Sequence, residues 1–129
     1  MTSRGLDILD EAECERLLDA RHFGRIVTKL GDGVAAFPVF YATDRNDIVF
    51  RTDPGTKLMA AVLHAQVAFE VDDEDKGWSV LVTGHCDEVR SHRDVERALA
   101  ALEPYWPAGE RARVVRIRTE RVTGRRLRT

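Results

Sequence analysis

Most of the chain alternates between apolar and polar residues with the short period of β-strands. Strands are predicted over 25–30, 48–52 and 66–72, and a longer one over 78–90. The segment 34–43 is apolar on both faces, which predicts a central strand that is buried on both sides. The pattern therefore indicates a mainly β protein.

Three stretches instead repeat their apolar residues with the spacing of short amphipathic helices. The first begins after Asp10 and ends near Arg21, and the others cover 56–65 and 93–102. Asp10 is expected to cap the first helix, with Glu13 three residues later.

The turns between the first three strands are too short for crossover connections. Residues 31–33 (Gly-Asp-Gly) and 44–47 (Asp-Arg-Asn-Asp) are hairpin signals, so these strands are expected to be antiparallel. A sixth strand is expected over 112–129, with a bend at Gly124. Six strands in hairpins and three short helices predict an α+β fold built on a closed or partly closed antiparallel barrel.

The 129 residues, 43% of them hydrophobic, suffice for one domain with a real core. We expect a single domain over 1–129, with residues 1–7 as a flexible N-terminal tail. No segment has the roughly 20 apolar residues that a membrane span needs, and the N-terminus lacks the apolar region of a secretory signal. We therefore expect a cytoplasmic protein with no membrane partner.

The net charge is only -2, but basic residues gather at the C-terminal end. Residues 111–129 hold eight arginines and a single acidic residue, Glu120. This segregation predicts either an anion-binding face or ion pairs within the fold, for example with the acidic run 70–75, whose part after the predicted strand 66–72 is expected to be a solvated loop. We favour the ion pairs. No nucleic-acid partner is expected, because no aromatic residues interleave with these arginines and the whole chain is slightly acidic.

No catalytic motif stands out. Cys14 and Cys86 lie far apart, and the four histidines have neither H-x-H nor H-E-x-x-H spacing, so no metal site is expected. The chain has no G-x-G-x-x-G fingerprint, no P-loop and no nucleophile elbow. The catalytic residues are therefore unknown, and the residues point to a binding site.

Hydrogen-bond donors gather where the predicted strand 48–52 turns into the predicted helix 56–65. The side chains are those of Arg51, Thr52, Thr56 and Lys57. If Thr56 caps the helix, the free amides of its first turn, the threonine hydroxyl and the helix dipole all favour an anion such as phosphate. The same pattern also fits a plain strand-to-helix turn.

Pro38 interrupts the apolar segment 34–43 and removes one donor from the β-ladder. It is tolerated at a bulge, at an edge, or where a ligand faces the backbone. Trp78 and Trp106 are large apolar groups for a small monomer, as expected of an interface or of a wall against a ring. Trp78 also fits an ordinary core position, Trp106 a loop anchor, and Ser79 an ordinary strand residue.

Eight pieces of the chain, in order, resemble the short members of the pyridoxamine 5'-phosphate oxidase-like family, which are flavin-binding split barrels. The resemblance covers residues 8 to 127. The pieces are LDEAECERLL, GRIVT, AFPVFYA, IVFRTDPGTKL, VAFEVDD, GWSVLVTG, YWPAG and VVRIRTERVTGRRL.

The resemblance implies a six-stranded, Greek-key split barrel that forms a homodimer with its cofactor sites at the subunit interface. By this likeness, 51–57 holds the cofactor's phosphate, and Phe37, Pro38 and Val39 run alongside its ring with their backbone. Trp78, Ser79 and the loop with Trp106 come from the partner chain. The chain lacks the C-terminal arginine-histidine element of true pyridoxamine phosphate oxidases, so that activity is not expected.

The function implied is that of a flavin-dependent oxidoreductase that passes hydride between its cofactor and a small planar substrate. The cofactor is expected to be FMN, with the deazaflavin coenzyme as the alternative, and it would carry the chemistry. The alternative function is a non-catalytic flavin- or haem-binding or storage module, with His64 or His85 as a haem ligand.

Overall fold

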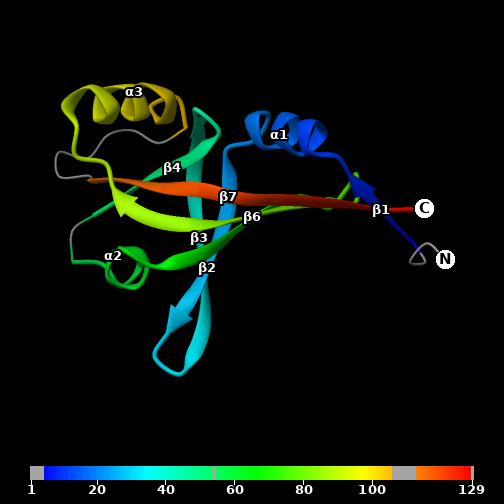
Figure 1. The fold of residues 1–129 in the computed structure, drawn as a ribbon, viewed down its shortest axis with the longest axis horizontal. Coiled ribbons are helices and arrows are strands. Elements are labelled where there is room, and N and C mark those ends of the chain that lie inside the picture. The colour runs from blue at the N-terminus through cyan, green and yellow to red at the C-terminus, as the bar shows by residue number, and fades with distance from the viewer. Residues whose placement is uncertain (1–4, 54, 106–112, 129) are drawn as a thin grey trace.

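The computed structural model describes residues 5–53, 55–105 and 113–128 (Figure 1). Its three helices are α1 (Glu11–Asp19), α2 (Lys57–Val62) and α3 (His92–Leu102). Its strands are β1 (Leu6–Leu9), β2 (Phe23–Leu30), β3 (Gly33–Asp44), β4 (Asp47–Thr52), β5 (Gln66–Asp73), β6 (Trp78–Glu88) and β7 (Arg113–Leu127).

Six of the strands close into a barrel. The order is β7-β4-β3-β2-β5-β6, and β6 pairs again with β7 to complete the ring, with every neighbour antiparallel. Strands β2, β3 and β4 follow one another as hairpins, and β5 returns to lie beside β2, which is the Greek-key order. The predicted six-stranded antiparallel barrel is confirmed.

A seventh strand, which the sequence pattern did not predict, lies outside the ring. In β1, Leu6 pairs with Leu127 and Asp7 with Arg126. These two residues were expected in a flexible tail. Backbone pairing with the end of β7 holds them in place, and Arg128 Nε donates a hydrogen bond to Asp7 Oδ1 at 2.7 Å.

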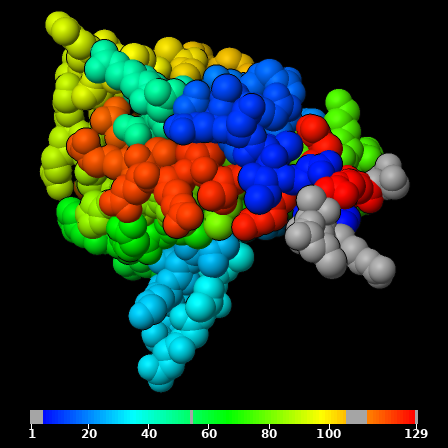
Figure 2. All heavy atoms as spheres, turned by 45° about the vertical axis from the view of Figure 1, so that its right-hand side comes forward, coloured from blue at the N-terminus to red at the C-terminus, as the bar shows by residue number. Residues whose placement is uncertain are grey.

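The hairpin of β2 and β3 projects from the barrel (Figures 1 and 2). The prediction that 34–43 is buried on both sides is wrong for the first part of β3, because Val34 is 73% exposed and Pro38 is also exposed. The strand enters the main core from Val39 onward, although Phe40 stays 37% exposed. The apolar residues near the tip of the hairpin are therefore a surface feature and not core.

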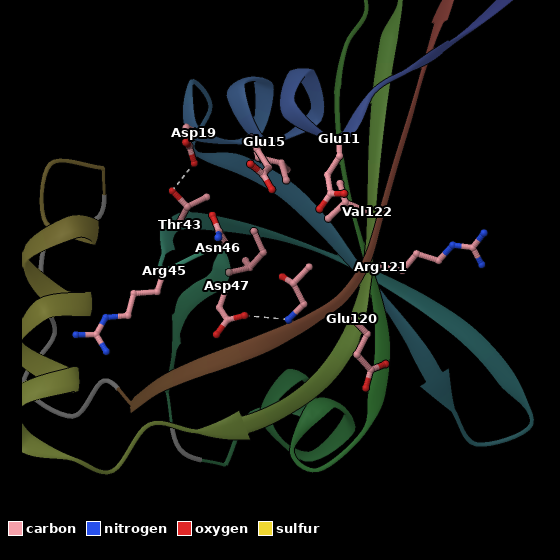
Figure 3. Close-up of a pocket in the computed structure, with 13 residues that line it drawn as sticks. Glu11, Glu15, Asp19, Thr43, Arg45, Asn46, Asp47, Glu120, Arg121 and Val122 are labelled. Atoms are coloured by element: carbon pink, nitrogen blue, oxygen red, sulfur yellow. Dashed lines mark hydrogen bonds between the residues drawn. The ribbon is translucent and has the colours of Figure 1, made fainter.

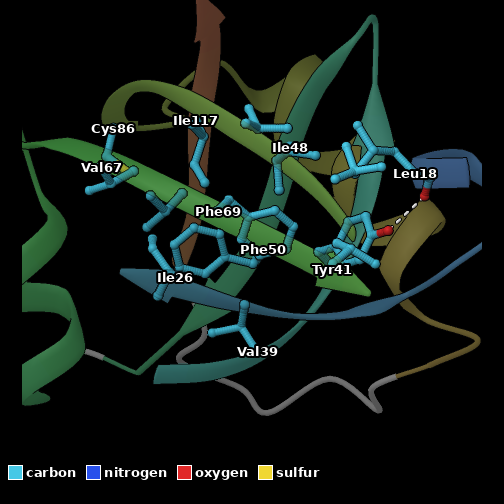
Figure 4. Packing of buried hydrophobic residues seen from close by; sticks show 14 of the residues in the cluster. Leu18, Ile26, Val39, Tyr41, Ile48, Phe50, Val67, Phe69, Cys86 and Ile117 are labelled. Atoms are coloured by element: carbon cyan, nitrogen blue, oxygen red, sulfur yellow. Dashed lines mark hydrogen bonds between the residues drawn. The ribbon is translucent and has the colours of Figure 1, made fainter. Parts of the chain in front are cut away.

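The main core fills the barrel. Tyr41, Phe50, Phe69 and Ile26 are fully buried there (Figure 4). The Tyr41 hydroxyl donates a hydrogen bond of 2.7 Å to the carbonyl oxygen of Leu18, which satisfies the buried hydroxyl and joins α1 to the barrel. A second cluster of buried residues lies between α3 and the outer face of the sheet: Ala42, Val49, Val89, Ala98, Leu102 and Val114.

The helix starts follow the sequence to within one residue, and so does the end of α3 at Leu102. Asp10 caps α1 as predicted, accepting a 2.8 Å hydrogen bond from the amide of Glu13. Helix α1 ends at Asp19, before the predicted Arg21. Helix α2 stops at Val62, three residues before the predicted end, because the next residues turn to pair with β6 through His64 N and Cys86 O.

Strand β7 runs through Gly124 without the predicted bend. A Cβ at that position would lie 2.5 Å from Cys14 Sγ, so the glycine lets α1 pack closely on the strand. The irregularity lies instead at the register shift between Thr83 and Gly84 of β6, which is a β-bulge in its pairing with β7.

The C-terminal arginines form ion pairs within the fold, as favoured above, but with other partners than 70–75. Arg118 pairs with Asp87, and Arg116 and Arg97 converge on Asp44. The first part of the acidic run 70–75 belongs to β5, which ends one residue after the predicted strand 66–72, and Arg25 faces Glu70 and Asp72 there.

Candidate functional site

The predicted strand-to-helix junction forms a compact polar site at the start of α2. Thr56 is the N-cap, and its Oγ1 accepts a 3.1 Å hydrogen bond from the amide of Met59. The same oxygen lies 3.0 Å from Oγ1 of Thr52, the last residue of β4. Each hydroxyl has one hydrogen, and their mutual bond uses one of them. The pair therefore keeps one hydroxyl hydrogen to donate to an anion.

Arg51 lies on the opposite face of β4 from Thr52. Neighbouring residues of a strand alternate between faces, and Thr52 shares its face with Phe50 of the barrel core, whereas Arg51 shares its face with Val49 under α3. Arg51 is only 4% exposed. Lys57, the first residue of α2, is exposed. The four predicted donors thus meet at one junction but approach it from different sides.

The pairing between β3 and β4 breaks beside this junction. Tyr41 pairs with Phe50, and continuing that register would place Val39 opposite Thr52 and Phe40 opposite Arg51. The ladder ends before those positions, while β3 continues along β2. This break is the split of the barrel, and it leaves the β3 edge before Tyr41 without a partner in β4.

Phe37, Pro38 and Val39 lie along that edge. Pro38 pairs with Arg25 of β2, and its missing amide falls on the part of β3 that has left the β3–β4 ladder. The edge interpretation of Pro38 is therefore confirmed. Val39 is buried, and Phe37 packs half-buried against the main core, so their side chains anchor the strand. The backbone is the part of this segment that a ligand can meet.

Within one copy of the protein, Trp78 and Ser79 lie far in space from the β4–α2 junction. Thr52 pairs with Arg113 near one end of β7, and Trp78 pairs with Arg126 near the other. Thirteen residues of extended strand correspond to roughly 40 Å measured along β7. The two groups do not share a site in one subunit, so any joint role needs a second chain.

The indole of Trp78 is part of its own subunit's core. It is 2% exposed, and the Arg21 guanidinium lies 5.5 Å from its ring centre. Ser79 is half-buried at the rim of a hollow of about 520 Å³ whose lining includes Leu6, Arg125 and Leu127. Trp106 lies outside the described residues. The cofactor role of these three residues stays a prediction.

A second hollow, which the sequence did not predict, lies under α1 (Figure 3). It has a volume of about 280 Å³ and a floor that includes Leu18, Ile48 and Val122. Its acidic lining residues are Glu11, Glu15, Asp19, Asp47 and Glu120. Figure 3 shows Arg45 and Arg121 turned away from it. Three of these acids form the wall that α1 contributes to the hollow. Their spacing of four residues, which puts them on one helix face, is visible in the sequence: Glu11, Glu15 and Asp19.

Two of the acids of this hollow already have structural roles. Asp19 Oδ1 accepts a 2.7 Å hydrogen bond from Thr43 Oγ1, and Asp47 Oδ1 accepts one of 3.0 Å from the amide of Thr119. Within 5–53, 55–105 and 113–128, no group of three or more acidic, histidine or cysteine side chains is arranged to hold a metal ion. In the same ranges, no helix is long and apolar enough to cross a membrane.

A Greek-key antiparallel barrel whose β3–β4 ladder breaks beside a threonine-capped helix defines the split β-barrel class. The chain belongs to the pyridoxamine 5'-phosphate oxidase family, whose sequence profile matches residues 10–126. The resemblance seen in the sequence is thereby confirmed.

Similar proteins include examples from Mycobacterium and Mesorhizobium. The uncharacterized protein Rv0080 of Mycobacterium tuberculosis is 35% identical over 128 residues, which cover 92% of this chain and 84% of the relative. The FAD-binding protein from Mycobacterium smegmatis is 35% identical with a TM-score of 0.81, covering 95% of this chain and 100% of that one. An FAD-binding protein from Mesorhizobium loti is 25% identical with a TM-score of 0.79, covering 95% and 99%.

Proposed function

We propose that residues 1–129 form one flavin-binding split-barrel domain, with the flavin phosphate at the start of α2 and the ring along the β3 edge. The observation that carries this proposal is the break in the β3–β4 ladder. It leaves Phe37–Val39 without a β4 partner on the strand that would otherwise continue alongside Thr52. The full-length likeness to two FAD-binding proteins supports the same ligand class.

The donors at the junction fit a phosphate. The Thr52–Thr56 pair offers one hydroxyl hydrogen, and the first amides of α2, those of Lys57 and Leu58, belong to the helix start that has no partner within its own helix. The exposed side chain of Lys57 is flexible, so its ammonium group can place a positive charge beside a bound anion. A phosphate held here by charge-assisted hydrogen bonds needs no metal ion.

A flavin titration tests the proposal directly. The purified protein is mixed with FAD, FMN or the deazaflavin coenzyme, and binding is followed by quenching of cofactor fluorescence. We expect saturable one-to-one binding of at least one of them, with FAD tested first because of the two FAD-binding relatives. Absence of binding by all three cofactors would overturn the proposal.

The flavin site is proposed to lie between two copies of the chain. Within one subunit the junction lacks a second wall, because Trp78 and Ser79 lie at the far end of the barrel. The projecting hairpin of β2 and β3 exposes Val34 and Leu30, which are 73% and 45% accessible and suit a homodimer contact. Light scattering coupled to size-exclusion chromatography is expected to give the mass of a dimer, and a strictly monomeric holoprotein would contradict this step.

We further propose an oxidoreductase that uses a small planar substrate. A bound flavin supplies hydride transfer, and the protein's part is to hold the phosphate, align the ring along β3 and exclude water. Stopped-flow mixing of the holoprotein with a nicotinamide donor distinguishes this from a storage module. Bleaching of the flavin absorbance and its return on addition of an acceptor support the enzyme. A cofactor that no donor reduces would support storage.

A further inference from the structure

The backbone groups of β3 point alternately to the two edges of the strand. Tyr41 donates its amide to the carbonyl oxygen of His22 at 2.9 Å, and the two residues stand opposite each other when the β2–β3 register is continued by one residue. In an antiparallel pair, opposite residues that exchange hydrogen bonds alternate with opposite residues that do not. The odd-numbered residues of β3 therefore bond to β2. The even-numbered ones, among them Ala36 and Pro38, direct their backbone groups to the other edge, where β4 pairs only from Tyr41 onward.

This other edge of β3 is short of hydrogen-bond donors. Ala36 offers it one amide and one carbonyl oxygen, whereas Pro38 offers only a carbonyl oxygen, because the proline nitrogen carries no hydrogen. Both residues are exposed. Among the residues that the structure describes, neither has a hydrogen-bond partner on this edge. The open edge is therefore richer in acceptors than in donors.

Pro38 also accounts for the end of the β3–β4 ladder. In continued register it would stand opposite Asp53, at a position where the alternation requires an exchange of two hydrogen bonds. Pro38 can accept there but cannot donate, so further pairing with β4 would form one bond of the two. Phe37 and Val39, whose side chains pack on the main core, hold the strand in place on either side of it. The acceptor-rich stretch is thus anchored while its outer edge stays unpaired.

We propose that Pro38 makes the open β3 edge select for a hydrogen-bond donor on the bound ring, so that reduced flavin is held more tightly than oxidised flavin. This inference rests on the flavin site proposed above, and it adds the residue that sets the preference between the two redox states. Hydride transfer to a flavin brings two electrons and one proton to the ring nitrogen N5, which changes from a hydrogen-bond acceptor into an N–H donor. A carbonyl oxygen matches the N–H form, whereas an amide at position 38 would match the oxidised form.

The first test compares FAD with 5-deaza-FAD, in which a carbon atom replaces N5. Each cofactor is titrated into the protein in its oxidised and its chemically reduced form without oxygen, and binding is followed by quenching of tryptophan fluorescence. The two reduced cofactors carry the same charge, so the comparison isolates the N5 position. We expect the preference for the reduced form to be about two- to tenfold larger with FAD than with 5-deaza-FAD, the scale of one hydrogen bond.

A variant then assigns the preference to the proline. Pro38→Ala supplies the missing amide and is expected to lower the preference for reduced FAD by about two- to tenfold, while the ratio for 5-deaza-FAD stays the same. Pro104→Ala makes the same substitution in the exposed turn after α3 and is the matched control, with no change in either ratio. The comparison of the two cofactors uses the natural chain, so it decides the question even if Pro38→Ala lets β4 pair further and closes the site.

The outcomes separate this inference from the flavin proposal. A proline that only keeps the exposed edge from pairing with other strands would give equal ratios for FAD and 5-deaza-FAD. That result, or a Pro38→Ala protein that keeps the ratio of the natural chain, would overturn the inference and leave flavin binding in place. Binding of the deazaflavin coenzyme alone would also overturn it, because that ring lacks N5. Absence of binding by every cofactor would remove the flavin function itself.

Discussion

The hydroxyl oxygens of Thr52 and Thr56 lie 3.0 Å apart, and through this contact the end of β4 is tied to the start of α2. Thr56 at the same time accepts the hydrogen bond of the Met59 amide. One hydroxyl thus serves both the helix cap and the proposed phosphate site, whereas the other serves the site without capping the helix. Substitutions can therefore separate stability from ligand binding.

Thr56→Ala is expected to lower both the free energy of unfolding and flavin affinity. Loss of the cap costs about 1 kcal/mol, and the ligand loses a hydroxyl partner as well. Thr52→Val keeps the shape and the cap, so it should weaken flavin binding with a smaller effect on stability. Urea denaturation and flavin titration measure the two quantities. Thr56→Ser, which retains the hydroxyl, is the control, and equal losses in Thr56→Ser would contradict the assignment.

Lys57→Ala is expected to weaken flavin binding by about 1–3 kcal/mol, the scale of a hydrogen bond to a charged group, with little change in stability because the side chain is exposed. Arg51→Ala is expected to weaken flavin binding on the same scale. At 4% exposure, Arg51 is also part of the packing beneath α3, so its removal should lower the free energy of unfolding as well. Lys29→Ala, on the hairpin, removes the same charge away from the junction and should leave flavin affinity unchanged.

Gly84→Ala is expected to destabilise the barrel by about 1–3 kcal/mol or more, the usual cost of overpacking. A Cβ at Gly84 would lie 2.1 Å from the carbonyl oxygen of Arg118, and backbone on both sides of the bulge would have to move. Gly33→Ala is the matched control, because its Cβ would be 3.8 Å from the nearest atom. Thermal unfolding measures both, and a Gly84→Ala protein as stable as Gly33→Ala would show that the bulge is not rigid.

The stability of the protein should depend on Glu70 around neutral pH. Burial, followed by the hydrogen bond and charge of Asp72, raises the pKa of Glu70 to about 7, against the opposing effect of Arg25. A raised folded-state pKa means that the native state holds the proton more tightly than the unfolded chain. Its stabilising effect is therefore fully present below pH 4.5 and is lost as the pH rises toward 7.

Glu70→Gln removes the titrating carboxyl group, so the stability of the variant should depend less on pH. Between pH 5 and pH 8, we expect the melting temperature of the variant to change less than that of the parent. At pH 8 the difference between the two melting temperatures should have shifted in favour of the variant. Melting curves at both pH values check the sign. Glu74→Gln, in the exposed turn after β5, is the control for a general charge effect. A parent protein that becomes more stable over the same interval relative to Glu70→Gln would contradict the prediction.

Local signals in the sequence were enough to predict the three helices and the six strands of the barrel, with starts close to the observed ones. The cap at Asp10, the hairpin turns and the alternation of the strands are properties of neighbouring residues, and the structure confirms them. The Asp-Arg-Asn-Asp turn before β4, for example, is made by positive φ angles at Arg45 and Asn46, as a tight hairpin requires. The donors at 51–57 were also visible, because strand, turn and capped helix follow one another in the chain.

Other features were decided only by contacts between segments far apart in the sequence. The sequence pattern made 34–43 a buried central strand, because apolar residues on both faces look the same whether they fill a core or an exposed arm. It made Gly124 a bend, because nothing in the chain near it shows that Cys14 packs there. It did not show which face of β4 lies under α3 and which lies beside Thr56.

By itself, then, the sequence determined the three helices and the six strands of the barrel, and which polar groups meet at the β4–α2 junction, because these follow from interactions between near neighbours. It did not determine β1, which exists through its pairing with the distant end of β7. Tertiary structure decided where the β3–β4 ladder breaks, how far Trp78 lies from Thr52, and that the edge of β3 at Pro38 stays open. These depend on barrel closure, in which β7 bridges β4 and β6, and barrel closure sets distances that sequence separation does not reveal.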